Sequence, residues 1–472
     1  MFFLEPIPTG DLSIWIKLGL DTIDNLEIVT QDSYTVSETG LMVYPAFLSL
    51  IYGILYKIKG LELVAVAHAF IPAVWLYFWY GFIKKYSLAH KNKSNIWSLR
   101  TLAVFLIASQ GLTLIYLPRP AMVSTILVLA SYYLVTILKN NPFSTKNILQ
   151  FSFIEFLWVN IHGSFLILPL MLIWQLPFLL LEKKYSLFRN RLQTFAFILL
   201  AALVNPFTWK VFPYVIETAV ISKARKIDEW FPTHYFNFPF ASWYFYAVSA
   251  IFIFILFNSS EKRRNFAELF SDSFFMFWLS GFFAIRNTFF IFLILPIFVF
   301  DKIFLSPSAA VVQKNRYSSP LNILIIAFLM TITFLLSPFQ KEDFSRFLPK
   351  KYQPTFDPGY RAEKINAFLE TANGNIFNTW EFGSDLALGQ KNKYFIDTRN
   401  IIFSNTIEKE YVKFLYEPEK SRDFLIKYRF KYYVIHRDYS ELIAWLGSQP
   451  NFKLIIDESP AFLFEKVGNL DL

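Results

Sequence analysis

Cysteine is absent from the 472-residue chain, so neither a disulfide framework nor a thiolate metal site is available to it. The sequence also lacks the HExxH, GxSxG and Walker A signatures of soluble metalloproteases, α/β-hydrolases and nucleotide-binding loops. No cleavable signal peptide is visible, because the start MFFLEPIPTGD has no basic residue and only a short apolar piece. These absences argue against the common soluble enzyme classes.

Apolar and aromatic residues, by contrast, are abundant. Hydrophobic residues make up 55% of the chain and aromatic residues 20%, including 56 Phe. Repeated apolar runs of about 18 to 20 residues are what spanning helices require. The composition predicts an α-helical polytopic membrane protein. Its net charge of +9 is then explained by basic cytoplasmic loops rather than by a nucleic-acid partner, and we expect none.

The charge of the loops predicts the topology. Five loops, 84–96, 139–147, 182–192, 258–268 and 301–319, hold 16 Lys/Arg against 4 Asp/Glu, whereas the alternating loops hold 6 Lys/Arg. Because positive charge favours the cytoplasmic side, the basic loops are expected there. About ten spans follow residue 60, at 61–83, 98–117, 121–138, 148–160, 163–181, 192–206, 240–257, 270–285, 288–300 and 320–337. The polar turns between them, and everything after residue 338, are expected outside.

The first forty residues are acidic, which conflicts with a cytoplasmic location. Counting back from loop 84–96, helix 61–83 must start outside, so a spanning 41–58 would place this head inside. The head has several Asp and Glu residues but one Lys. We predict that 1–40 is an external acidic loop segment and that 41–58 is an interfacial helix, which its Tyr and Lys residues suit. The alternative is an ordinary span with an internal acidic head.

The composition after residue 338 becomes that of a soluble domain. Strands are expected at 374–378, 393–399, 431–437, 452–458 and 461–467, with helices at 360–371, 405–416, 418–428 and 439–447. This alternation predicts a small α/β domain over 338–472, with a mainly parallel sheet and a hairpin at Ser459-Pro460. No Gly-rich phosphate loop opens any of these helices, so a nucleotide site is not expected. The alternative to a functional role is a rigid cap over the membrane part.

Two arginines at expected helix ends on the outer face are candidate phosphate ligands. Arg119 lies in LPRP, and Arg286 precedes Asn287 in AIRN. A guanidinium fork suits a phosphate or pyrophosphate, and ionisable groups near membrane depth persist where they line a cavity. The alternative for each is contact with lipid head groups at the interface.

Carboxylates and one imidazole accompany these arginines. Asp11 and Asp32 have apolar and aromatic neighbours that suggest partial burial, where a carboxylate acts as a general base or orients a hydroxyl. His162, in the turn WVNIHG, is a candidate proton shuttle or orienting group, or else a structural turn residue. Glu229 and Trp230 form a candidate sugar platform, or an exposed loop pair.

The order of these pieces resembles a known family. The segments DLSIWIKLG, QDSYT, PRP, LWVNIHGSF, NPFTW, DEW, IRN and YFIDTR follow one another from residue 11 to about residue 467. Together they resemble multi-spanning glycosyltransferases of the C structural class (GT-C), and more narrowly a group of bacterial integral membrane proteins. The resemblance implies a GT-C-like membrane domain over 41–337 in the inner (cytoplasmic) membrane, with an extracytoplasmic C-terminal domain.

The resemblance also implies an activity. It is an inverting transfer of a sugar from a polyprenyl-phosphate carrier to an envelope acceptor (glycan, lipid or protein) on the outer face. Asp11 matches the catalytic carboxylate, with Asp32 second. Arg119, Arg286 and Lys57 fall where the donor phosphate would bind. The residues expected to position the sugar or acceptor are Asn160, His162, Glu229, Trp230 and Asn287.

Two departures from the class affect these expectations. The class places a spanning helix ahead of the Asp segment, whereas ten residues precede Asp11 here, so either the start lies upstream or the chain is a shortened form. Some members of the class use a second acidic residue in this loop, but LPRP has no carboxylate, so a divalent metal is only weakly supported. No other cofactor is expected. The alternatives to an enzyme are a transporter or flippase and a non-catalytic scaffold of an envelope polysaccharide pathway.

Overall fold

The structure is a computed structural model. It describes residues 10–36, 42, 44–89, 99–113, 120–224, 230–235, 239–258, 270–299, 301, 363–389, 391–397, 399, 403, 405–458 and 460–468. Among the predicted site residues, Arg119 and Glu229 lie outside these ranges, and for Asp11 the backbone alone is described. The predicted span 320–337 also lies outside them.

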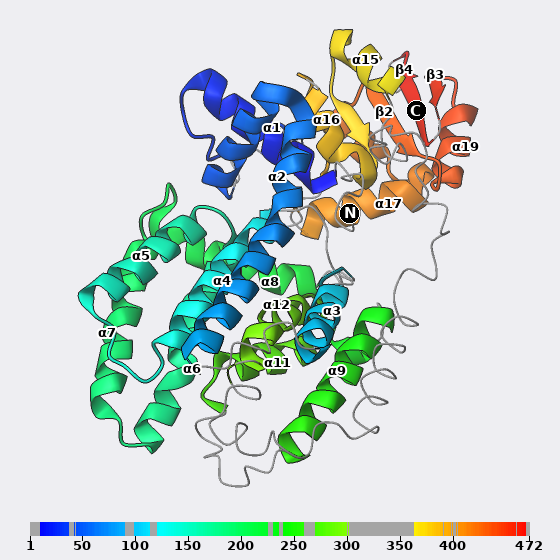
Figure 1. Ribbon diagram of the computed structural model, residues 1–472. Helices are drawn as coiled ribbons and strands as arrows, with labels where there is room; N and C mark the ends of the chain where they lie inside the picture. The colour runs from blue at the N-terminus through cyan, green and yellow to red at the C-terminus, as the bar shows by residue number, and fades with distance from the viewer. Residues whose placement is uncertain are drawn as a thin grey trace.

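Helices make up most of the N-terminal two thirds of the chain (Figure 1). They are α1 (Gly10–Asn25), α2 (Ala46–Ala89), α3 (Leu99–Thr113), α4 (Pro120–Ile137), α5 (Thr145–Val159), η2 (Gly163–Leu166), α6 (Ile167–Leu181), α7 (Tyr185–Ala202), η3 (Thr208–Lys210), α8 (Val211–Ala224), η5 (Thr233–Tyr235), α9 (Pro239–Asn258), α11 (Ser273–Phe283), η6 (Ile285–Asn287) and α12 (Thr288–Val299).

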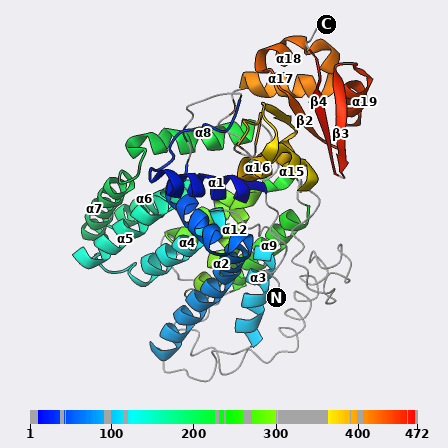
Figure 2. The ribbon, with the colours of Figure 1, turned by 90° about the horizontal axis from the view of Figure 1, so that it is seen from above.

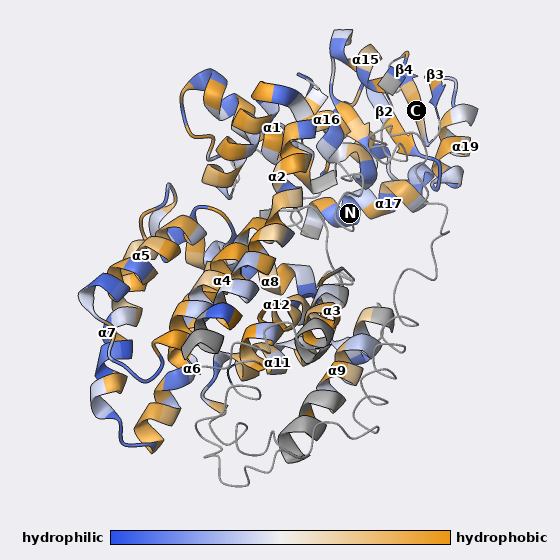
Figure 3. Cartoon of the chain, in the orientation of Figure 1, coloured by the Kyte–Doolittle hydropathy of each residue, from blue (hydrophilic) through white to orange (hydrophobic). Residues whose placement is uncertain are grey.

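Hydrophobic residues predominate along most of these helices (Figure 3), and several of them are exposed. On α5 the side chains of Leu149, Phe153 and Phe156, spaced four and three residues apart, are 64%, 60% and 36% exposed. Leu170 and Ile173 on α6 are exposed in the same way. A contiguous apolar face of this kind is unfavourable in water and suits contact with lipid or a partner.

Two helical stretches, Ala46–Lys84 and Gly163–Leu181, are long and apolar enough to cross a membrane. Shorter apolar helices cover Ala121–Ile137, Ser273–Phe283 and Ile285–Val299. The described ranges thus place helices at most of the predicted runs but do not show ten full-length spans. The structure adds α8 inside 205–239, which the sequence predicted as a loop.

Helix α2 is divided by a sharp break where the sequence predicts the interfacial helix to end. Lys59 and Gly60 leave helical geometry, and Gly60 has φ +64°, in the left-handed region that favours glycine. A Cβ on Gly60 would meet nothing within 4 Å, so backbone conformation rather than space selects glycine there. The segment before the break is therefore a separate helix, as predicted; its position relative to a membrane stays a prediction.

The acidic head is a helix over Gly10–Asn25, not a loop, and it packs between α2 and the C-terminal domain (Figures 1 and 2). Leu12 and Ile16 belong to a core shared with α2, whereas Ile14 and Leu18 belong to a core shared with the C-terminal domain. Gly19 permits the close approach to α2, because a Cβ there would lie 1.9 Å from the Ser49 carbonyl oxygen. Apolar residues on both sides explain why the head folds.

The C-terminal domain has a four-stranded sheet with the order β1-β2-β4-β3. Its elements are α15 (Glu363–Thr371), β1 (Ile376–Asn378), η11 (Trp380–Phe382), α16 (Gly383–Gly389), α17 (Asn405–Tyr416), η13 (Pro418–Lys420), α18 (Arg422–Tyr428), β2 (Tyr432–His436), α19 (Ser440–Ser448), β3 (Phe452–Glu458) and β4 (Ala461–Lys466). β1 and β2 are parallel, but β4 is antiparallel to both β2 and β3. The sheet is therefore mixed and not mainly parallel, because the predicted hairpin inserts its second strand next to β2.

The predicted strand 393–399 does not form as a regular strand. Tyr394 alone makes isolated parallel bridges, to Ile376 of β1 and to Thr35 of the head. The Asn378 side chain takes the place of the ladder: it accepts from the Phe395 N–H at 2.9 Å and donates to the Ile396 carbonyl at 2.7 Å. The head is thus joined to the edge of the sheet through Tyr394.

Candidate functional site

The turn after α5 holds a small hydrogen-bonded group of polar side chains. The indole N–H of Trp158 donates to the Ser164 hydroxyl at 3.0 Å, and that hydroxyl donates to Ser124 on α4 at 3.1 Å. His162 Nδ1 lies 2.8 Å from the same hydroxyl and accepts from the Ser164 backbone N–H at 3.1 Å. The group fixes the turn against the start of α4, the helix that follows LPRP.

The bonding of His162 sets which ring nitrogen carries the proton. Nδ1 accepts a backbone hydrogen bond, so the proton of the neutral ring lies on Nε2. Burial and, as a smaller cause, the positive charge of Arg286 together lower the pKa of His162 to about 3. The ring is therefore neutral at physiological pH and presents Nε2–H as a hydrogen-bond donor.

Replacing His162 by Gln is expected to reduce the loss of stability at acid pH. The folded ring has a pKa of about 3, below its unfolded value of about 6.5, so the unfolded state takes up the proton first and stability falls as pH drops below about 6.5. This contribution is on the order of 1–2 kcal/mol between pH 7 and pH 5. Denaturant unfolding at both pH values measures it. His234→Gln, at an exposed histidine, is the control, and an unchanged pH dependence in the His162 variant would contradict the assignment.

Arg286 and Trp230 lie together near this turn. The Arg286 guanidinium carbon is 4.3 Å from the centre of the Trp230 ring, a cation–π geometry. The backbone N–H of Ile285 donates to the Phe231 carbonyl at 3.0 Å and joins the two segments. Two motifs that the sequence placed on separate loops, DEW and IRN, are therefore neighbours. The effect of Arg286 on the His162 pKa puts its charge within electrostatic reach of the turn.

Other segments close around the same turn. Both amide hydrogens of Asn160 are used inside the fold, at 2.8 Å to the Phe156 and Val204 carbonyls, so its carbonyl oxygen is what remains for a ligand. The Tyr44 hydroxyl donates to the Val159 carbonyl at 2.5 Å. A Cβ on Gly163 would come within 3.1 Å of Val215 on α8. Asn287 donates to the Ser280 carbonyl at 3.2 Å, a bond within its own helix pair.

The start of α1 reaches this region, whereas Lys57 makes its ion pair elsewhere. Leu12, next to Asp11, shares a core cluster with Ile161 of the turn. Lys57 instead pairs with Asp24 at the far end of α1, at 2.9 Å, with both side chains more than half exposed. The beginning of α1, and not its C-terminal end near Asp24, is therefore the part that the fold brings to the turn.

Asp32 has a structural partner that the sequence did not reveal. Its carboxylate accepts from Arg399 at 2.8 Å, and Arg399 also binds Asp397 at 2.6 Å; the three side chains are buried. Asp32 further accepts from the Thr35 backbone and hydroxyl. Burial opposes the charge of Arg399, but Asp397 and Asp32 outweigh it and hold the pKa of Arg399 above its ordinary value. This ion cluster fastens the head to the C-terminal domain.

The charges of the ion cluster act on a tyrosine of α8. Burial raises the pKa of Tyr214 on that helix, while Arg399 lowers it and Asp397 raises it. The Tyr214 ring in turn lies 5.9 Å from the Tyr44 ring, centre to centre, in an edge-on arrangement. Tyr214 therefore packs on Tyr44, whose hydroxyl binds the turn at Val159, and its pKa responds to the charges of the ion cluster.

Sequence reasoning missed three polar groups near the turn. Ser124 and Ser164 gave no signal, because serine is common in membrane helices. Glu155 did give one: a single carboxyl in an apolar helix is costly and is rarely accidental. Glu155 is fully buried, and within the part of the chain that the structure describes neither of its carboxyl oxygens has a hydrogen-bond partner.

The chain matches no family model and no curated protein sequence. Among solved structures it is similar to the archaeal oligosaccharyltransferase AglB from Archaeoglobus fulgidus, solved with an inhibitory peptide and a dolichol-phosphate: the TM-score is 0.53 and the identity 12%, over 98% of this chain and 71% of that one. Two crystal structures of the oligosaccharyltransferase from the same organism are also similar. The complex with Zn and sulfate has a TM-score of 0.48 and 13% identity over 97% and 69% of the two chains, and the apo form 0.49 and 13% over 91% and 66%. At 12% identity the first likeness concerns the fold alone, and on that level the chain resembles an oligosaccharyltransferase, in agreement with the GT-C resemblance of its motifs.

Proposed function

We propose that this protein is a membrane glycosyltransferase that moves a sugar from a polyprenyl-phosphate carrier to an envelope acceptor on the outer face of the cytoplasmic membrane. The observation that carries the proposal is the meeting, at one end of an apolar helix bundle, of Arg286 over Trp230, the neutral His162 and the first turn of α1. A cation, a hydrogen-bond donor and a carboxylate-bearing helix end are what such a transfer needs.

The fold likeness to AglB supports the same class of reaction. The AglB structure is a complex with an inhibitory peptide and a dolichol-phosphate, a lipid phosphate. In this chain the donor would be the corresponding lipid-phosphate sugar, whereas the acceptor is an unidentified glycan, lipid or protein. The exposed apolar faces of α5 and α6 would let the lipid tail enter from the side.

Each site residue has one task in the proposed reaction. Asp11 deprotonates or orients the acceptor hydroxyl, which attacks the anomeric carbon with inversion as the bond to the carrier phosphate breaks. Arg286, together with Arg119, stabilises the negative charge that grows on the departing phosphate. The His162 Nε2–H and the Asn160 carbonyl oxygen hold sugar hydroxyls.

The other candidate residues have supporting roles in the proposed reaction. Asp32 is bound to Arg399, so we assign it to positioning of the head rather than to catalysis. Lys57 is exposed and pairs with Asp24, so we leave the donor phosphate to Arg286 and Arg119. Trp230 packs against Arg286 and offers, with Glu229, a platform for the sugar, and Asn287 braces the helix end.

Replacing Arg286 by Gln is expected to lower kcat for sugar transfer by about 10²–10³-fold, the loss typical of one missing charge-stabilising donor. The variant loses its contact with Trp230, which costs about 0.5–1 kcal/mol of stability, so it should still fold. Transfer is measured with a radiolabelled polyprenyl-phosphate sugar and membranes that supply the acceptor. Arg189→Gln, at an exposed arginine of α7, is the matched control. Equal turnover in wild type and Arg286→Gln would remove Arg286 from the phosphate site.

Mass spectrometry of the purified protein tests the function as a whole. A co-purified polyprenyl-phosphate sugar, together with a missing sugar in the envelope glycan of a deletion strain, is the expected result. A flippase would carry the lipid but leave labelled sugar on it in the transfer assay, and a scaffold would carry no polyprenyl phosphate. Either of these results would contradict the proposal.

A further inference from the structure

Three aromatic side chains gather on the segment 230–235, which precedes α9. The Tyr235 ring lies 5.3 Å from the Phe231 ring and 4.7 Å from the His234 ring, centre to centre, at interplanar angles of 39° and 36°. Tyr235 is 59% exposed, and His234 is exposed as well. The rings of Phe231, His234 and Tyr235 thus form one aromatic patch at the surface of the protein.

The backbone beneath the aromatic patch is fixed at two points. The Phe231 carbonyl accepts from the Ile285 N–H at 3.0 Å. The hydroxyl of Thr233, which is fully buried, lies within hydrogen-bond distance, 3.0 Å, of the Tyr246 hydroxyl on α9. The rings are therefore held in place without a ligand, which lowers the entropic cost of binding one.

Polar atoms at the edge of the aromatic patch are free. Within the described residues, neither the Tyr235 hydroxyl nor the His234 ring has a hydrogen-bond partner. No lysine or arginine belongs to the patch, so it lacks the cation that an anionic ligand needs. The patch combines apolar ring faces with hydrogen-bonding groups at their edges.

The aromatic patch lies beside the candidate phosphate site. Trp230, the residue before Phe231, carries the Arg286 guanidinium 4.3 Å from the centre of its ring. Tyr235 follows Trp230 by five residues, so the backbone keeps the two within about 18 Å of each other. A ligand on the patch would therefore extend toward the place where the carrier phosphate is proposed to bind.

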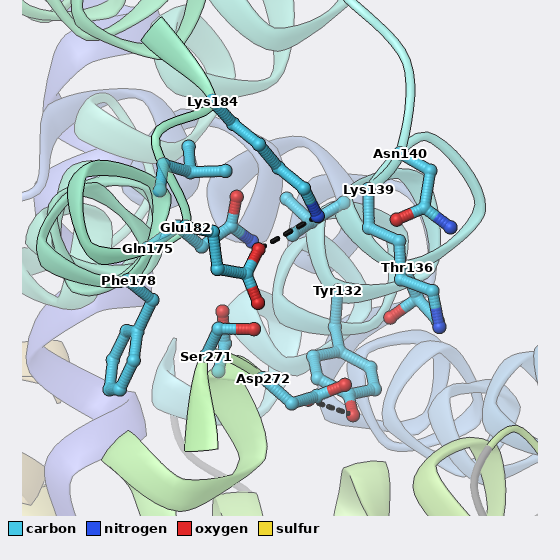
Figure 4. A pocket seen from close by; sticks show the side chains of 13 residues that line it. Tyr132, Thr136, Lys139, Asn140, Gln175, Phe178, Glu182, Lys184, Ser271 and Asp272 are labelled. Carbon is cyan, nitrogen blue, oxygen red and sulfur yellow. Dashed lines mark hydrogen bonds and ion pairs between the residues drawn. The ribbon is translucent and has the colours of Figure 1, made fainter. Parts of the chain in front are cut away.

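The pocket at the C-terminal ends of α4 and α6 differs from the aromatic patch in both space and free groups (Figure 4). Its cavity volume is about 40 Å³, room for a few water molecules. Its two carboxylates are already bonded, Glu182 to Lys184 at 2.7 Å and Asp272 to the Tyr132 hydroxyl at 2.8 Å. The exposed aromatic patch is therefore the better place for a ligand of the size of a sugar.

A saccharide matches the chemistry of the aromatic patch. Its ring has a C–H face that stacks on an aromatic side chain, and hydroxyls around its edge that bond to groups such as a phenol or an imidazole. A lipid chain would leave these polar atoms unused. A peptide is usually held by a strand edge or a helix groove, whereas η5 is a short 3₁₀ turn. We propose that the aromatic patch binds a saccharide, and that this saccharide is the acceptor of the transfer.

The identity of the acceptor rests on the proposed function, whereas the binding of a saccharide does not. In the transfer, a hydroxyl of the bound saccharide would form the new bond to the anomeric carbon and give up its proton to Asp11. The electron pair of the broken bond would leave with the carrier phosphate beside Arg286. The product would be a glycan extended by the transferred sugar, rather than a glycosylated protein.

Retention of glycans on the immobilised full-length protein in detergent tests the aromatic patch without any transfer. The probe is the mixture of fluorescently labelled oligosaccharides that mild acid releases from the cell envelope. Wild type should retain a fraction of it, and Tyr235→Ala should weaken that retention about tenfold through the loss of one stacked ring. Tyr235→Phe keeps the ring and should stay within about threefold of wild type. Tyr185→Ala, at a tyrosine of α7 that is 63% exposed, is the matched control and should bind as wild type does.

Transfer kinetics connect the saccharide with the reaction. With the same oligosaccharides as acceptors, Tyr235→Ala should raise KM about tenfold and leave kcat within about twofold, because the ring holds the acceptor and takes no part in the exchange of bonds. The labelled product should resist protease digestion.

The two measurements separate the aromatic patch from the proposed function. Retention that depends on Tyr235 in a protein without transferase activity would support the saccharide site and overturn the enzyme. Equal retention by wild type and Tyr235→Ala, or an unchanged KM in that variant, would overturn the aromatic patch as a binding site. A labelled product that protease destroys would identify a peptide acceptor and contradict the proposal.

Discussion

Replacing Asp11 by Asn is expected to lower sugar transfer by about 10³-fold or more, the upper range for loss of a general base, while the protein still folds. Asp11 lies in the first turn of α1, beside Leu12, which shares a core cluster with Ile161 of the His162 turn. A carboxylate at a helix N-terminus also stabilises the helix, by about 0.3–1 kcal/mol. Asparagine keeps the size and the capping ability of the side chain, so the variant removes the charge with a small effect on stability.

The matched control is Asp24→Asn, at the other end of the same helix. Asp24 is exposed and pairs with Lys57, so its loss should change stability by less than about 1 kcal/mol and leave transfer unchanged. Single-turnover transfer and denaturant unfolding are measured for both variants. Transfer at the wild-type rate in Asp11→Asn, or an equal loss in both variants, would reject Asp11 as the base.

Replacing Arg399 by Gln is expected to destabilise the protein by about 3–5 kcal/mol, because it leaves two buried carboxylates without their cation. Asp32 and Asp397 are at most 2% exposed, and both bind the Arg399 guanidinium. The head should detach from the C-terminal domain, which chemical denaturation and limited proteolysis after α1 would detect. Arg422→Gln, at an exposed arginine of α18, is expected to have little effect.

A double-mutant cycle isolates the contact between the head and the C-terminal domain. In Asp32→Asn with Arg399→Gln one of the two stranded charges is removed as well, so the double variant should be more stable than the sum of the two single effects predicts. Strictly additive losses would mean that Asp32 and Arg399 do not interact. A stable Arg399→Gln variant would mean that the cluster is not buried in solution.

Local signals predicted much of the fold. The change from apolar runs to a soluble pattern placed the C-terminal domain, and β-branched and aromatic residues at 431–437, 452–458 and 461–467 predicted β2, β3 and β4 correctly. Lys59 and Gly60 end the first part of α2 between the two apolar runs predicted at 41–58 and 61–83. These features are determined by residues that are close in the sequence, so they can be predicted from it.

Long-range contacts decided the points that the sequence could not. The segment at 393–399 has the composition of a strand, but the Asn378 side chain replaces its ladder. The prediction of a mainly parallel sheet was wrong, because the insertion of β4 beside β2 depends on tertiary contacts. Asp32 looked available for catalysis until Arg399, 367 residues later, was placed against it. Arg119 and Glu229 remain predictions, outside the described residues.

Cysteine labelling from each side of the membrane tests the central idea that the polar segments share one outward-facing end. The chain has no cysteine, so each single-cysteine variant carries one reactive site. Asn25→Cys and His234→Cys represent the proposed outer face, and Lys146→Cys and Lys183→Cys the opposite ends of α5 and α6; all four side chains are exposed. In intact cells an impermeant maleimide should modify the first two, and should reach the second two only after permeabilisation. Labelling of Asn25→Cys and His234→Cys from opposite sides would contradict the account.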